Sequence, residues 1–280
     1  MYIHIYASLS IAIFQICLYN IVLHENFRMI PFIMKTFSHI VIFFLSVFLG
    51  GCGDDKQDHR IKFATSADYP PFEYHENGEI KGFDIDLARF IGKELGKEVI
   101  FEDMRFGAIL GALQSGSVDA AISTITTTEE REKNFDFSDS YYKESLAIVY
   151  PKDRPLVDKA QLSKKKIACQ LGTTMEIWLK NHVLDAEISS MDNNGQAIEA
   201  LKSGYVDGVF IDSIQARAFC QKNPKLYYSV IAQSDLGYAI VMQKGSPLKD
   251  KVNKILRHLE KEGVLEELRK KWFDNVKWKS

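Results

Sequence analysis

The chain has 280 residues, and its 35 Lys and Arg against 37 Asp and Glu give a formal net charge of −2 at pH 7. Hydrophobic residues make up 46% of the chain and charged residues 26%, which is the composition of an ordinary globular protein. A balance this close to neutral, on the acidic side, provides no basic face for nucleic acid. We therefore exclude a nucleic-acid partner.

The first 51 residues are predicted to be a leader. The segment that begins at Met34, MKTFSHIVIFFLSVFLGGC, has one Lys, an apolar stretch over 40–49 and small residues before Cys52. This is the pattern of a secretory signal. A cysteine directly after Leu-Gly-Gly resembles the lipobox of bacterial lipoproteins. We therefore expect Cys52 to be lipidated and 52–60 to form a polar tether to the membrane.

A second apolar segment precedes this signal. Residues 1–23 contain no Lys, Arg, Asp or Glu and are long enough to span a membrane. We favour Met34 as the true first residue, with an additional transmembrane helix as the alternative. The leader holds Arg28 and Lys35 against Glu25, so its removal changes the net charge from −2 to −3.

Strands and helices alternate from residue 61 onwards. Residues 61–65 (IKFAT) predict a buried strand, and Asn77-Gly78 predicts a two-residue hairpin turn. Asp84 is expected to cap a helix that ends near Gly96. A strand at 98–102 and a helix at 106–116 follow. Such alternation implies βαβ units and parallel sheets.

The alternation restarts after residue 151. We predict strands at 165–170, 186–190 and 206–211, with helices at 174–182 and 194–204 between them. The similar segments LAIVYPK (146–152) and YAIVMQK (238–244) are interpreted as paired hinge strands between the two halves. The amphipathic segment 247–273 is expected to be helical and to pack on the first half. Lobe 1 then comprises 61–150 and 245–280, and lobe 2 comprises 151–244.

One motif occurs twice. ALQSGSVDAAI (112–122) and ALKSGYVDGVF (200–210) are identical at six of eleven positions. Each predicts the end of a helix, a left-handed Gly and a buried strand, which is also a common αβ arrangement without function. The residues after the two copies differ, however. Ligands bind beyond the carboxyl ends of parallel strands, where the first copy leads to Ser123, Thr124, Thr126 and Arg131, and the second to Asp212. A zwitterion would need both the guanidinium and the carboxylate.

Two cysteines, Cys169 and Cys220, follow the leader and tether. Export permits a disulfide between them, but their spacing does not decide whether they pair. We favour two buried thiols, and the disulfide stays open.

Four motifs resemble the amino-acid-binding branch of the bacterial extracellular solute-binding proteins, family 3. They are GFDIDLARFIGKEL (82–95), FDFSDSYY (135–142), QLGTTME (170–176) and KKWF (270–273). The resemblance runs from about Ile61 to Phe273. It implies an α/β protein with the two-lobed, type II periplasmic-binding-protein fold, each lobe a mainly parallel sheet flanked by helices, joined by a two-strand hinge. It also implies a periplasmic or cell-surface monomer that binds a free L-amino acid for an ABC permease, without cofactor or metal.

The resemblance also implies roles for individual residues. Arg131 matches the arginine that binds the ligand's α-carboxylate, with the Thr126 hydroxyl beside it, and a planar guanidinium suits a carboxylate. Asp212 matches the carboxylate that binds the α-ammonium. Further matches are Ser123 and Thr124 near the ammonium, Gly172, Thr173 and Thr174 as a loop with N–H groups near the ligand, and Tyr69 and Phe106 as aromatic walls.

Two positions leave the ligand's side chain open. Ser66 stands where relatives that bind basic amino acids can carry an acid, which weakens the case for lysine or arginine. Gln170 stands where a glutamine-type relative has a lysine, which weakens the transfer of glutamine. Asp68 is two positions beyond Ser66, and the sequence does not show where it points. We expect a polar amino acid, glutamine-like or basic.

The alternative is an enzyme on the same fold, because some exported dehydratases of cyclohexadienyl acids resemble it. Such an enzyme needs a general acid or base in the cleft. The chain shows no Ser-His-Asp pattern, and its histidines after residue 52 fall in predicted segments away from the strand ends: His59, His75, His182 and His258. We therefore predict a binding protein without catalytic residues.

Overall fold

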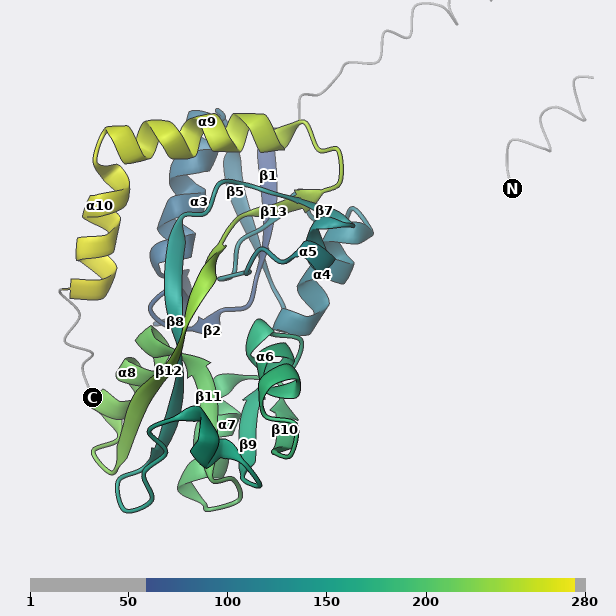
Figure 1. Cartoon of the computed structure of the whole chain (residues 1–280). Helices are drawn as coiled ribbons and strands as arrows, with labels where there is room; N and C mark the ends of the chain where they lie inside the picture. The colour runs from purple at the N-terminus through teal and green to yellow at the C-terminus, as the bar shows by residue number, and fades with distance from the viewer. Residues whose placement is uncertain (1–58, 275–280) are drawn as a thin grey trace, which may run out of the picture. The chain divides into compact units, whose positions relative to one another are not determined.

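The computed structural model describes residues 59–274 (Figure 1). The predicted leader, Cys52 and all but the last two residues of the predicted tether lie outside this range. None of the helices in the described part of the chain is both long and apolar enough to cross a membrane.

The first lobe is built on a five-stranded sheet with the order β5-β1-β6-β13-β7. A small antiparallel sheet, β2-β3-β4, lies beside it, and its Asn77-Gly78 turn has positive φ at both residues, as the hairpin prediction requires. The strands are β1 Arg60–Thr65, β2 Asp68–Tyr69, β3 Glu73–Glu76, β4 Glu79–Lys81, β5 Glu98–Asp103, β6 Ala120–Ala121, β7 Phe135–Phe137 and β13 Val241–Gln243; the helices are α3 Phe83–Glu94, α4 Phe106–Gln114 and α5 Glu129–Glu132.

The second lobe repeats this plan with the sheet β10-β9-β11-β8-β12. Its strands are β8 Tyr142–Pro151, β9 Lys166–Gln170, β10 Glu187–Met191, β11 Gly208–Asp212 and β12 Leu226–Tyr238. Its helices are η1 Lys159–Leu162, α6 Thr174–His182, α7 Asn194–Lys202 and α8 Ser213–Lys222.

In each five-stranded sheet one strand opposes the other four. It is β13 in the first sheet and β8 in the second, and in both it is the strand that enters from the other lobe. The mainly parallel, two-lobed α/β fold is therefore confirmed. The similar segments 146–152 and 238–244 are equivalent because they supply this fourth strand of each sheet.

The connection between the lobes differs from the expected pairing. The two similar segments do not pair with each other; instead β8 and β12 form an antiparallel ribbon that runs from one lobe into the other (Figure 1). Tyr142 and Tyr238 pack with the first-lobe core, whereas Ile148 packs in the second lobe. Register shifts between Val230 and Gly237 interrupt the ribbon between these two cores.

Both sheets are buried on both faces, which explains their continuous apolar strands. Along β8, Leu146, Ile148 and Tyr150 face one core cluster, while Ala147 and Val149 face another. This is the two-residue alternation of a strand. The sequence of a central strand therefore reads as uniformly apolar because each of its faces meets a separate core.

The repeated motif has a structural explanation. Gly116 and Gly204 both adopt a left-handed φ, of 74° and 77°, directly after α4 and α7. The Asp119 carboxylate accepts a hydrogen bond from the Lys62 N–H at 2.8 Å, and Asp207 accepts one from the Lys166 N–H at 3.0 Å. The identical residues thus end a helix and fix the entry of a neighbouring strand in each lobe, while the residues beyond the motif face the cleft.

The C-terminal segment is helical, as expected, but it is divided. Gly263, with φ of 77°, separates α9 Leu248–Lys261 from α10 Val264–Arg269, and a π-helical turn, η2 Lys270–Asp274, follows. Leu256, Leu265 and Trp272 belong to the first-lobe core. The segment therefore packs on lobe 1, as predicted.

Both cysteines of the described chain are free thiols. Cys169 is buried and Cys220 is half-buried, and burial raises the pKa of each thiol to about 12. Neither is therefore a thiolate at neutral pH.

Candidate ligand-binding site

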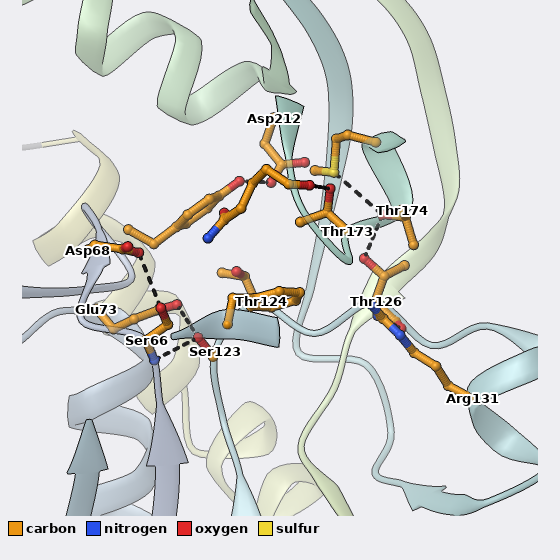
Figure 2. A pocket seen from close by; sticks show the side chains of 14 residues that line it. Ser66, Asp68, Glu73, Ser123, Thr124, Thr126, Arg131, Thr173, Thr174 and Asp212 are labelled. Atoms are coloured by element: carbon orange, nitrogen blue, oxygen red, sulfur yellow. Dashed lines mark hydrogen bonds between the residues drawn. The ribbon is translucent and has the colours of Figure 1, made fainter. Parts of the chain in front are cut away.

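A small cavity lies between the lobes. Every predicted site residue except Gly172 lines it. The cavity also has three lining residues that the sequence analysis did not assign to it. The complete lining is Ser66, Asp68, Tyr69, Glu73, Phe106, Ser123, Thr124, Thr126, Arg131, Gln170, Thr173, Thr174, Met175 and Asp212 (Figure 2).

Arg131 stands on one side of the cavity. Its main-chain N–H is fixed by the Thr128 hydroxyl, which caps α5. The guanidinium donates to the carbonyl oxygens of Thr126 at 2.8 Å and Gly172 at 3.1 Å, and lies 6.0 Å from the Phe106 ring centroid. Burial lowers the pKa of Arg131 to about 10, so it remains a cation at neutral pH. With two of five N–H donors used in these bonds, the group retains donors for a carboxylate.

Asp212 supplies the opposite charge from the second lobe. It ends β11 at the N-cap position of α8, yet its side chain makes no capping hydrogen bond. Only 2% of the residue is exposed, and its carboxylate accepts a hydrogen bond from the Tyr69 hydroxyl of the first lobe. Asp212 is thus turned into the cleft, as a role in ligand binding requires.

The loop before α6 differs from the expectation at one residue. The Gly172 N–H donates to the Glu176 carboxylate at 2.8 Å, so it does not face the cavity. Its carbonyl oxygen accepts from Arg131 instead. Thr173 caps α6, and the Thr174 hydroxyl lies 3.4 Å from that of Thr126 across the cleft. The loop therefore contacts the first lobe through the Gly172 carbonyl oxygen and the Thr174 hydroxyl.

The carboxyl ends of β1 and β6 meet at the floor of the cavity. The Ser66 N–H donates to the Ser123 hydroxyl at 3.1 Å. Thr124 has a left-handed φ of 47°, a strained conformation for a β-branched residue. Its N–H donates to Asp84 at 2.9 Å, which holds the strain in place. Strain of this kind is typical of functional sites.

Asp84 therefore corrects one prediction, since it does not cap a helix. Gly82 occupies the N-cap position of α3, and the fully buried Asp84 lies in the first turn. Its carboxylate accepts from the Thr124 N–H and, at 2.8 Å, from the Tyr141 hydroxyl. Burial raises the pKa of Asp84 to about 6.

The end of the cavity away from Arg131 is acidic (Figure 2). Asp68 and Glu73 both line it beside Ser66. Desolvation, together with the nearby Asp103 carboxylate, raises the pKa of Asp68 to about 6 against the opposing effect of its Ser66 hydrogen bond. Ser66 itself carries no carboxyl group, but its neighbours Asp68 and Glu73 bring two carboxyl groups to the same end of the cavity. The sequence signal for Glu73 is its position four residues after Tyr69, a predicted site residue.

Two α/β lobes that close on one cavity, with a guanidinium from one lobe and a carboxylate from the other, define a two-lobed binding protein. The model of the bacterial extracellular solute-binding proteins, family 3, matches residues 61–275. The chain belongs to this family. No group of His, Cys, Asp or Glu within residues 59–274 is arranged to hold a metal ion.

Three similar proteins illustrate the family. The arginine-binding extracellular protein ArtP of Bacillus subtilis is 36% identical over 230 residues, covering 80% of this chain and 90% of ArtP. The structure of the amino acid ABC transporter substrate-binding protein AbpA from Streptococcus pneumoniae, bound to L-arginine, is 34% identical, covers 78% of this chain and 96% of its own, and has a TM-score of 0.74. The ancestral amino-acid-binding protein AncCDT-1, a precursor of cyclohexadienyl dehydratase, is 34% identical, with coverages of 78% and 96% and a TM-score of 0.72.

These relatives decide between the two functional classes. The chain is an amino-acid-binding, ABC-transporter substrate-binding protein and not an enzyme. Even the neighbour related to the dehydratase is a binder by its description. Membership of an extracellular family implies a periplasmic or surface location.

Proposed function

We propose that the chain captures a polar L-amino acid, glutamine-like or basic, between its lobes and delivers it to an ABC permease. The observation that carries this proposal is the placement of Arg131 and Asp212 in one cavity, on different lobes. Arg131 binds the α-carboxylate and Asp212 the α-ammonium. Ser123, Thr124, Thr126, Thr173 and Thr174 supply hydroxyl and main-chain groups around them, while Tyr69 and Phe106 form apolar walls.

The acidic end of the cavity favours a basic side chain within that class. With the α-groups held by Arg131 and Asp212, the ligand's side chain points towards Asp68 and Glu73. The relatives ArtP and AbpA, which are described with arginine, support the same choice.

Calorimetric titration of the full-length protein, purified in detergent, tests this function. L-Arginine, L-lysine and L-glutamine are titrated beside D-arginine, which presents the α-groups with the wrong hand. We expect at least one L-amino acid to bind and D-arginine to bind far more weakly. Mass spectrometry of any amino acid that copurifies identifies the natural ligand. Absence of binding by all L-amino acids would refute the proposal.

We propose in addition that the protein is a monomer anchored by lipid on Cys52. Replacing Cys52 by Ala should leave an unlipidated precursor with altered membrane extraction and gel mobility. A Cys52→Ala protein that fractionates and migrates like the wild type would contradict the anchor. Intact mass of the purified protein should show nothing upstream of Cys52.

A further inference from the structure

Two buried carboxyl groups meet below the acidic end of the cavity. Glu73 of β3 and Asp84 of α3 are both 0% exposed. Glu73 Oε1 accepts from the Ser123 hydroxyl at 2.8 Å, and Asp84 Oδ2 accepts from Thr124 and Tyr141. The remaining oxygens, Glu73 Oε2 and Asp84 Oδ1, are buried and receive no donor from other groups of the described chain.

The two carboxyl groups are held close together, because the Asp84 N–H donates to the Phe72 carbonyl oxygen at 2.9 Å, directly before Glu73, and their donors Ser123 and Thr124 are consecutive residues. Two ionised carboxylates in one buried site repel each other, and a proton shared between them removes this repulsion. The unfilled oxygens are accounted for if this proton lies between them. The pair with one proton carries a single negative charge.

Within the described residues, 59–274, no cation balances the pair. The groups that face it are the Asp68 carboxylate, the Tyr141 hydroxyl and the donors of Ser123 and Thr124. No Lys, Arg or His side chain in residues 59–274 forms an ion pair with either carboxyl. Burial and the neighbouring Asp84 charge raise the pKa of Glu73 well above its usual range. Loss of the shared proton is therefore unfavourable until another positive charge arrives.

Glu73 is the member of the pair that reaches the ligand. It lines the cavity on the side opposite Arg131 (Figure 2), whereas Asp84 is not among the lining residues. In the proposed binding mode, a guanidinium or ammonium at the end of the ligand's side chain comes to Glu73. A positive charge at this point balances the negative charge of the carboxyl pair, as the shared proton does without ligand.

We propose that a cationic ligand side chain replaces the shared proton of Glu73 and Asp84, so that binding of a basic amino acid releases one proton while binding of a neutral analogue releases none. The exchange is balanced in charge. The ligand brings one positive charge, the pair changes from one negative charge to two, and the proton passes to solvent. Acidification then weakens basic ligands selectively. This inference rests on the amino-acid-binding function proposed above.

The experiment compares L-arginine with L-citrulline, which has a neutral ureido group in place of the guanidinium. The full-length protein in detergent is titrated calorimetrically in two buffers with different ionisation enthalpies, between pH 5.5 and 8. We expect arginine to release close to one proton and its Kd to rise up to about tenfold for each pH unit of acidification in this range. Citrulline should release none and its Kd should stay flat.

Two variants identify the source of the proton. Glu73→Gln should abolish the proton release with arginine. Asp68→Asn is the control, because Asp68 also lines the cavity and its pKa of about 6 makes it the rival source of a proton. This control should leave the release unchanged.

The outcomes separate this inference from the proposed function. If arginine binds without proton release, or if both ligands release protons equally, the exchange is refuted although amino-acid binding stands. If only neutral amino acids bind, it is also refuted. If no amino acid binds at any pH, the proposed function itself fails. The wild-type proton count decides the question even if Glu73→Gln does not fold.

Discussion

Replacing Asp212 by Ala tests the proposed contact with the α-ammonium. Asp212 is 2% exposed, so its charge acts in a desolvated site. Truncation of one partner in a buried, hydrogen-bonded charge pair costs about 2–5 kcal/mol. At about 1.4 kcal/mol per decade, affinity should fall roughly 30- to several-thousand-fold. The ligand-free protein loses one hydrogen bond from Tyr69, worth about 1 kcal/mol.

Asp192→Ala is the matched control for this variant. Asp192 also bridges the lobes, through a 3.2 Å ion pair with Arg105, but the two side chains are 43% and 78% exposed. Such exposed pairs contribute at most about 1 kcal/mol, so affinity should change by no more than about fivefold. The contrast between the two aspartates thus separates ligand binding from lobe closure.

Calorimetry with L-arginine and L-glutamine measures the affinities. Thermal melting with and without ligand measures the stability that ligand binding adds. At a ligand concentration of about 100 times Kd, the wild type should gain roughly 2.7 kcal/mol. Asp212→Ala should melt nearly normally without ligand and lose most of this gain. If it binds within about threefold of the wild type, Asp212 does not contact the ammonium.

Three further outcomes follow from the fold. Saturating L-arginine should reduce the radius of gyration in small-angle scattering, because a ligand contacts both lobes only when they close about the β8–β12 ribbon; an unchanged radius with bound ligand would refute hinge closure. In urea unfolding, Gly204→Ala should lower the free energy of unfolding by about 1 kcal/mol, because Gly204 has a left-handed φ. Gly82→Ala should lower it several times more, since its Cβ would lie 2.0 Å from the Phe72 carbonyl oxygen. Equal losses in the two variants would contradict this reasoning. The pKa of Asp84 is raised to about 6 from an ordinary 3.8, so this group stabilises the folded protein below pH 4 and the contribution is lost as pH rises through 6. Asp84→Asn should therefore flatten the plot of unfolding free energy against pH between pH 4 and 6. An unchanged slope would mean that another group causes the pH dependence.

Most elements could be predicted because local patterns dictate them. The strand at 61–65, the Asn77-Gly78 turn and the helix at 174–182 depend on alternation, turn chemistry and capping within a few residues of each other. The position of Arg131 and Asp212 at one cavity could also be predicted, since both follow strand ends of the two repeated motifs.

The acidic pair could not be predicted from local pattern. Asp84 stands near the start of a helix, where an acid ordinarily caps, and only Thr124 and Tyr141, 40 and 57 residues away, draw it into the core. Glu73 begins a hairpin strand whose last two residues are exposed, and its burial depends on Ser123, 50 residues away. The expected pairing of 146–152 with 238–244 was wrong for a similar reason, because their similarity reflects equivalent places in two sheets.

The position of β13 has a consequence for the order of folding. It lies between β6 and β7, and β7 pairs with no other strand in the described chain. The first sheet is therefore incomplete until residues 241–243 have been made, whereas the second sheet is built from the continuous stretch 142–238. Contacts between such distant segments carry a large loop-closure entropy and form slowly. The lobe that begins the chain is thus the later one to finish, after the lobe inserted within it.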